Sequence, residues 1–191
     1  MSAKRNNTMP TVKASLRSNA LKFVSSPLRV LDVFCRYGEM FNAVYKDAEK
    51  YTGIDIDPRC KDDKREVLIG KAEKVLKQID VNEYNVFDLD AYSDPYQEFI
   101  YIVGNLKKEG EYHFFFTESL GRKLRQHHYT KQFTFESKPS FVRNNRLGFF
   151  KWLIKSICES NGCEFADVVC YQKRTASRTI YSWVKVVKKG S

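Results

Sequence analysis

The chain has 191 residues, 42% of them hydrophobic and 29% charged, which suits one globular domain with a full core. No apolar run approaches the roughly 20 residues that span a bilayer, and the polar residues 1–9 do not form a secretory signal, so we expect a cytoplasmic protein. The net charge of +10 favours a polyanionic partner such as DNA or RNA, although a merely soluble basic protein has the same balance. Five cysteines without a Cys/His cluster at zinc spacing predict reduced thiols and no metal site.

Strand and helix patterns alternate along the chain from residue 28 onward. Before them, residues 1–20 are basic with few large apolar side chains, and we expect a flexible arm there, followed by one domain at 21–191. Apolar runs predict strands at 28–34, 51–56, 67–69, 84–90, 112–117, 165–171 and 179–187. Apolar residues at helical spacing predict helices at 39–50, 72–79, 96–107 and 147–160.

This order predicts an α/β domain with a single doubly wound, mainly parallel seven-stranded sheet and a C-terminal antiparallel hairpin. In such sheets ligands bind at the carboxyl ends of the strands, near the point where the strand order reverses. Candidate site residues are therefore sought where each predicted strand ends.

The first strand leads into a helix through Asp32-Val-Phe34-Cys-Arg36-Tyr37-Gly38. A tight turn at this place lets the backbone approach a ligand closely. The stretch resembles motif I, D-x-F-x-G-x-G, of class I S-adenosylmethionine-dependent methyltransferases. The resemblance implies a Rossmann-like methyltransferase fold and S-adenosylmethionine as cofactor, with contacts from Asp32, Phe34, Arg36, Tyr37 and Gly38.

Arg36 stands where that family has its first glycine. If this position has a positive φ, a side chain there costs on the order of 1–2 kcal/mol. Two interpretations stay open: the guanidinium pairs with the methionine carboxylate of the cofactor, or the chain has lost cofactor binding.

Gly53-Ile-Asp55-Ile56-Asp57 ends the second predicted strand. A carboxylate here suits two ribose hydroxyls, and the resemblance implies this role for Asp55, with Ile56 against the adenine. Asp57, before Pro58, is also a candidate helix cap. At the third family position Lys71 replaces an acid, so the neighbouring Ala72 is expected to contribute through its backbone. The dinucleotide fingerprint GxGxxG is absent, which argues against a nicotinamide enzyme.

Asp90-Ala-Tyr92-Ser-Asp-Pro95 follows the fourth predicted strand. It resembles motif IV of tRNA guanine-N2 dimethyltransferases and of amino-nitrogen DNA methyltransferases. The resemblance implies that Asp90 accepts the N–H bonds of an exocyclic amino group and takes its proton, and that Tyr92 stacks on the base. The alternative is an ordinary Asx-turn before a helix.

A basic, aromatic segment at 118–146 follows the fifth predicted strand. Cations neutralise phosphates and aromatic rings stack on bases, so this mixture predicts a nucleic-acid surface. Its candidate contacts are Arg122, Lys123, Arg125, His127, His128, Lys131, Arg143 and Arg146. The leading hypothesis is methyl transfer to an amino nitrogen of a nucleic acid. The alternatives are a non-catalytic nucleic-acid-binding protein on a degenerate methyltransferase fold, and a protein or small-molecule methyltransferase.

Overall fold

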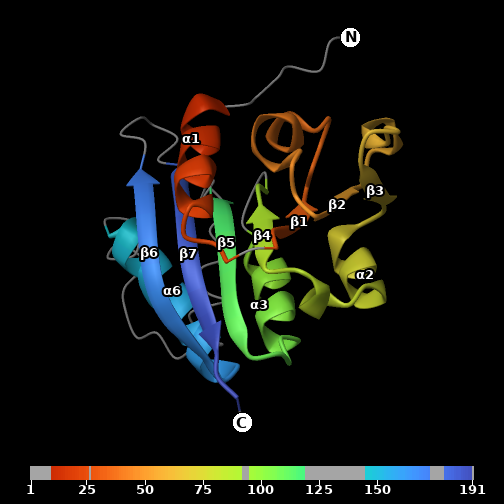
Figure 1. Ribbon diagram of the computed structural model, residues 1–191. Helices are drawn as coiled ribbons and strands as arrows, with labels where there is room; N and C mark the ends of the chain where they lie inside the picture. Colours follow the sequence, from red (N-terminus) through yellow and green to blue (C-terminus); the bar gives the residue numbers. More distant parts are fainter. Residues whose placement is uncertain (1–9, 26, 92–94, 119–144, 173–178, 191) are drawn as a thin grey trace.

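Seven strands form one sheet in the order β3-β2-β1-β4-β5-β7-β6 (Figure 1). The computed structural model describes residues 10–25, 27–91, 95–118, 145–172 and 179–190. The strands are β1 Arg29–Val33, β2 Lys50–Asp55, β3 Glu66–Ile69, β4 Val86–Leu89, β5 Gly110–Glu118, β6 Cys163–Gln172 and β7 Ile180–Lys188. Strands β1 to β5 are parallel, and β7 runs antiparallel between β5 and β6. The predicted Rossmann-like sheet with its C-terminal hairpin is confirmed.

The helices differ from the predicted ones mainly in length. They are α1 Pro10–Leu21, α2 Ala72–Val75, α3 Tyr96–Gly104 and α6 Arg146–Ser160, with a π-helical turn at Phe41–Tyr45 and 3-10 turns at Pro58–Cys60, Leu76–Gln78 and Val81–Glu83. The predicted helix 39–50 is too long, because β2 already begins at Lys50 and the chain must turn before it. No helix among the described residues has the length and apolarity needed to cross a membrane.

Side chains alternate between the two faces of the sheet, as a strand requires. Leu31, Phe87 and Phe114 point to the larger core, which α2, α3 and α6 cover. Val30 and Phe115 point to the other core, which α1 and the π-helical turn cover. Figure 1 shows α1 and α6 on opposite sides of the sheet. Asp32 and Asp88 are register partners on β1 and β4, and they belong to the α1 side.

Helix α1 replaces the flexible arm expected for residues 10–20, and residues 1–9 lie outside the described residues. Its buried side chains include Lys13 and Arg17, and the Arg17 guanidinium lies 5.4 Å from the centre of the Phe115 ring. The helix is therefore anchored largely by buried cations, whereas the sequence prediction looked for an apolar stripe. That is why the pattern of residues 1–20 showed no helical periodicity.

Candidate functional site

A cavity of about 420 Å³ opens at the carboxyl ends of β1, β2 and β4. Its volume falls within the range of small-molecule sites, roughly 300–1,000 Å³. The strand order reverses between β1 and β4, which is where doubly wound sheets bind ligands. The lining residues are Phe34, Arg36, Ile54, Asp55, Ile56, Gly70, Lys71, Ala72, Glu73, Asp90 and Glu98.

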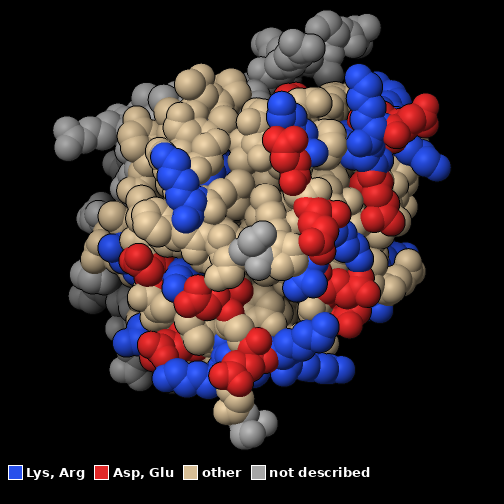
Figure 2. Space-filling model, in the orientation of Figure 1, with Lys and Arg blue, Asp and Glu red and all other residues tan. Residues whose placement is uncertain are grey.

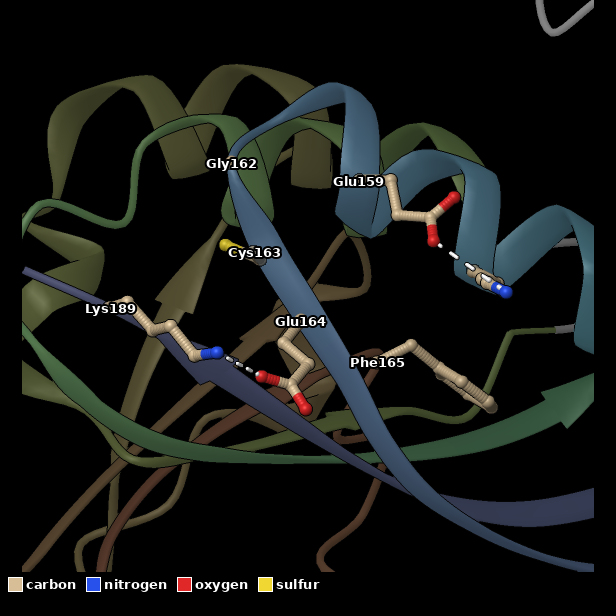
Figure 3. Close-up of a pocket in the computed structure, with 7 residues that line it drawn as sticks. Glu159, Gly162, Cys163, Glu164, Phe165 and Lys189 are labelled. Atoms are coloured by element: carbon tan, nitrogen blue, oxygen red, sulfur yellow. Dashed lines mark ion pairs between the residues drawn. The ribbon is translucent and has the colours of Figure 1, made fainter. Parts of the chain in front are cut away.

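A second cavity, of about 510 Å³, lies between the end of α6 and the strands β6 and β7 (Figure 3). Two ion pairs border it: Lys155 with Glu159 at 3.7 Å, and Lys189 with Glu164 at 2.7 Å. The C-terminal end of β7 pairs with the start of β5, so this cavity lies at the amino edge of the parallel strands. No candidate site residue lines it, and the cavity at the carboxyl edge is the better site.

The turn after β1 has three alternate residues in the left-handed region, Phe34 at φ 78°, Arg36 at φ 48° and Gly38 at φ 82°. Two of them are not glycine, so each costs on the order of 1–2 kcal/mol unless neighbouring contacts hold it. The backbone N–H groups of Phe34 and Cys35 donate to the Ile54 carbonyl at 2.9 and 3.0 Å. Arg36 thus has a positive φ, and its side chain occupies a strained position of the kind that glycine usually fills.

Arg65, just before β3, binds the carbonyl groups of this turn. Its Nη2 atom donates to the carbonyl oxygens of Arg36 at 2.6 Å and Cys60 at 2.8 Å, and its Nε atom donates to Asp62 at 2.9 Å. The guanidinium also lies against Gly38, where an added Cβ atom would come within 2.9 Å of the Arg65 Cζ atom. Glycine is therefore favoured at position 38, because a side chain there would be strained by the positive φ and would displace the Arg65 guanidinium.

Asp55 is fixed at the end of β2 by two backbone donors. The N–H of Arg36 donates to its Oδ2 atom and the N–H of Asp57 to its Oδ1 atom, both at 2.9 Å. Each carboxylate oxygen has two lone pairs, so Asp55 keeps acceptor capacity for a ligand in the cavity. Asp57 itself caps the next 3-10 turn, accepting from the Arg59 N–H at 3.0 Å.

Asp90, one residue beyond β4, lies on the cavity and faces Lys13 of α1. The Lys13 Nζ atom is 2.7 Å from both carboxylate oxygens. Burial alone would raise the pKa of Asp90, but Lys13 and the nearby Arg17 hold that pKa below its usual range. Asp90 is therefore a carboxylate at neutral pH and a strong hydrogen-bond acceptor, although a weak base.

Asp32 lies beneath this site and does not line the cavity. It accepts a hydrogen bond from Tyr51 Oη at 2.7 Å. Burial and the like charge of Asp88 raise the pKa of Asp32 well above its usual range. Asp32 is therefore harder to ionise than an ordinary aspartate, because its charged form is both poorly solvated and close to another acid.

The structure thus brings together many of the predicted site residues. Five of the predicted cofactor residues line one cavity with Asp90: Phe34, Arg36, Asp55, Ile56 and Ala72. Asp32, Tyr37 and Gly38 do not line it, and Tyr37 is half exposed, with its hydroxyl 3.4 Å from Asp57. Tyr92 lies outside the described residues.

The predicted nucleic-acid contacts lie almost entirely outside the described residues. These are Arg122, Lys123, Arg125, His127, His128, Lys131 and Arg143. Arg146 is described and is buried, 3.4 Å from Glu118, which puts its guanidinium inside the fold rather than on the surface. No group of three His, Cys, Asp or Glu side chains in the described ranges is placed to hold a metal ion.

The charge excess of the chain is unevenly distributed. Residues outside the described ranges hold 11 of the 33 Lys and Arg and two of the 23 Asp and Glu, which leaves 22 cations and 21 acids in the described part. Figure 2 shows both signs interspersed over one face. The described body is nearly neutral, and segment 119–144 alone has six cations against one acid.

Solved structures share this arrangement of strands and helices at low sequence identity. A methyltransferase from Archaeoglobus fulgidus, described as dependent on S-adenosylmethionine, has 16% identity and a TM-score of 0.54, over 93% of each chain. TYW2 of M. jannaschii, in complex with AdoMet, has 11% identity and a TM-score of 0.54, over 93% of this chain and 77% of that one. The fold is that of the class I S-adenosylmethionine-dependent methyltransferases.

Methyltransferases with this fold also include the N-methyltransferase NodS from Bradyrhizobium japonicum. It has 12% identity and a TM-score of 0.53, over 95% of this chain and 94% of that one. No protein-family model and no curated protein sequence matches the chain. At these identities the comparison shows the methyltransferase fold alone, because one fold carries many functions.

Proposed function

We propose that the chain is an S-adenosylmethionine-dependent methyltransferase that acts on an exocyclic amino nitrogen of a nucleic-acid base. One observation carries the proposal. The turn after β1, the acid at the end of β2 and the acid after β4 surround a single cavity where the strand order reverses. Motifs that were identified separately along the chain therefore meet where this fold binds ligands.

The cavity residues fit the cofactor. Asp55 is held by two backbone donors with lone pairs to spare for the ribose hydroxyls. The neighbouring Ile56 is 64% exposed and lines the cavity, so it offers an apolar surface on which an adenine can pack. Arg36 lines the same cavity and offers a planar cation for the methionine carboxylate. The bound cofactor supplies an electrophilic methyl group on its sulfonium.

Asp90 is the proposed partner of the acceptor nitrogen. An exocyclic amino group has a lone pair delocalised into its ring and is a poor nucleophile. By accepting an N–H hydrogen bond, Asp90 turns that lone pair toward the methyl group. The lowered pKa of Asp90 makes it a weak proton acceptor, so we assign it an orienting role and expect the proton to leave to water. The base-stacking role of Tyr92 remains a prediction.

The charge distribution supports a nucleic acid as substrate. The described body is nearly neutral, and segment 119–144, which follows β5 in the sequence, combines an excess of cations with aromatic residues. Cations beside stacking rings are the usual means of binding single-stranded nucleic acid. The neighbours with this fold do not decide the acceptor, because one of them is a magnesium protoporphyrin IX methyltransferase.

Calorimetry with S-adenosylmethionine and S-adenosylhomocysteine tests the cofactor, and transfer of a labelled methyl group to total tRNA or genomic DNA tests the acceptor. We expect binding of both cofactor forms and incorporation into one polymer. Asp90→Asn should abolish incorporation while cofactor affinity stays within about twofold of wild type, since the change is isosteric. Binding of nucleic acid without cofactor binding would favour the alternative of a non-catalytic protein, which the strained Arg36 keeps open.

A further inference from the structure

Lys13 lies at the candidate acceptor site although it comes from the first helix. Its Nζ atom is 2.7 Å from both Asp90 oxygens, and its side chain is only 7% exposed. The Nζ atom also lies 5.9 Å from the centre of the Tyr181 ring, within cation–π range. The Asp90 side chain is 17% exposed and lines the cavity. A buried cation therefore faces the carboxylate that is proposed to receive the substrate.

The charges around this pair balance. One helical turn beyond Lys13, Arg17 pairs with Asp88, and both of those side chains are fully buried. Asp32 on β1 also lies close to Asp88, and burial and that neighbouring acid raise the pKa of Asp32. Lys13 and Arg17 thus each pair directly with one carboxylate, so the negative charge of Asp90 is already compensated by Lys13 before any substrate arrives.

Because Lys13 compensates the charge of Asp90, it changes which amines can bind to that carboxylate. A carboxylate has about four acceptor positions, and Lys13 occupies one on each oxygen. The remaining positions can accept N–H bonds from an uncharged amino or amide group. A protonated alkylamine would instead bring another cation next to the Lys13 ammonium in a poorly solvated place, where like charges repel strongly.

We infer that Lys13 is a specificity-determining residue that restricts the acceptor to uncharged, conjugated amines and excludes alkylammonium groups. The inference rests on the proposed function, in that it takes Asp90 as the partner of the acceptor nitrogen. It deepens that function by naming the substrate class. Amino groups of bases are uncharged at neutral pH, whereas polyamines and lysine side chains are cationic.

The test uses two probes of similar size, n-butylammonium and the uncharged butyramide, with binding followed by ligand-observed NMR and calorimetry. Wild type should bind butyramide in preference to n-butylammonium. Lys13→Met keeps a similar stem but leaves the Asp90 charge exposed to the cavity. It should bind n-butylammonium at least about tenfold more tightly than wild type, a change of roughly 1.4 kcal/mol.

Three variants make the result specific. Lys13→Arg keeps the cation and should behave as wild type toward both probes. Lys13→Met combined with Asp90→Asn should lose the gained affinity, because the carboxylate is gone. Lys13→Gln serves in place of Lys13→Met if the methionine variant does not fold. The inference is also overturned if wild type binds n-butylammonium as tightly as butyramide.

The outcomes separate the two proposals. If S-adenosylmethionine does not bind wild type, the proposed function fails, yet the amine probes still report the charge at Asp90. If the cofactor binds and the folded Lys13→Met or Lys13→Gln variant gains no affinity for n-butylammonium, the specificity role of Lys13 is wrong and the proposed methyltransferase stands.

Discussion

Arg17 and Asp88 form a fully buried ion pair that joins the first helix to the central strand β4. The Nε and Nη2 atoms of Arg17 lie 2.5 and 2.6 Å from the two carboxylate oxygens, and Tyr45 Oη donates to the same carboxylate at 2.7 Å. Four residues of helix rise about 6 Å and two residues of strand about 6.6 Å. Lys13 and Arg17 on α1 can therefore face Asp90, just after β4, and Asp88, on β4, as two parallel pairs.

Arg17→Met should destabilise the protein by about 3–5 kcal/mol, because it leaves Asp88 buried without its cation. Urea unfolding at pH 7 measures the loss. Replacing both partners, Arg17→Met with Asp88→Leu, should recover much of it, since no unpaired charge stays inside. The matched control is Lys22→Met, an exposed cation just after α1, which should change stability by no more than about 0.5 kcal/mol. A similar small change for Arg17→Met would contradict the buried-pair interpretation.

Arg65→Met should weaken S-adenosylmethionine binding about tenfold or more, since charge-assisted hydrogen bonds to the turn carbonyls are worth about 1.5–3 kcal/mol each. The turn loses its donors to the Arg36 and Cys60 carbonyls, and Gly38 loses the group packed on it. Calorimetry gives the affinity, and circular dichroism checks that the variant is folded. Arg59→Met is the control, because the Arg59 side chain is exposed and pairs with Asp57 instead of the turn carbonyls that Arg65 binds. Equal effects of the two variants would argue against a positioning role for Arg65.

Arg36→Gly should be about 1 kcal/mol more stable than Arg36→Ala, because glycine adopts the positive φ of this position without strain. This difference already allows for the larger conformational entropy that glycine loses on folding. Both variants lack the guanidinium, so both should bind S-adenosylmethionine more weakly than wild type if Arg36 holds the methionine carboxylate. 5′-Methylthioadenosine lacks that carboxylate and provides the control ligand. An equal loss of affinity for both ligands would mean that Arg36 acts on the turn and not on the carboxylate.

The parts of the site that the sequence predicted are those built from local geometry. A buried strand followed by a turn puts Phe34 and Arg36 at the sheet edge, and strand ends do the same for Asp55 and Asp90. Lys13 was missed because its contact with Asp90 spans 77 positions of the chain. Ion pairs of this kind leave no periodic pattern, so helix α1 was taken for an arm.

Arg65 was missed for a related reason. Its role depends on where the loop after β2 folds back on the turn after β1, and a lone arginine in the polar run 61–66 gives no sign of that approach. The shortened helix after Gly38 has the same origin, since the start of β2 limits it. The mainly parallel sheet with its C-terminal hairpin was predictable from the alternation of elements, whereas buried polar contacts between distant segments were not.

His113 should make the protein less stable as the pH falls from 6.5 toward 4. Its ring is buried on β5, its Nδ1 atom accepts from Trp183 Nε1 at 3.1 Å, and burial lowers its pKa to about 4. The unfolded imidazole has a pKa of about 6.5, so between these values only the unfolded chain takes up the proton. The free energy of unfolding is therefore unaffected by protonation of His113 well above pH 6.5, and it should fall by about 2 kcal/mol by pH 5.

Urea unfolding of wild type and His113→Gln at pH 7 and pH 5 measures this loss. The variant has no imidazole to protonate, so its stability should fall by about 2 kcal/mol less between the two pH values. Its absolute stability at pH 7 will be lower if the glutamine packs poorly, which is why the difference between the two pH values is the quantity compared. Replacing His127 and His128 by glutamine removes the other two histidines of the chain and should leave the wild-type pH dependence unchanged. A pH dependence that follows those two residues and not His113 would show that the buried imidazole is not the group that titrates.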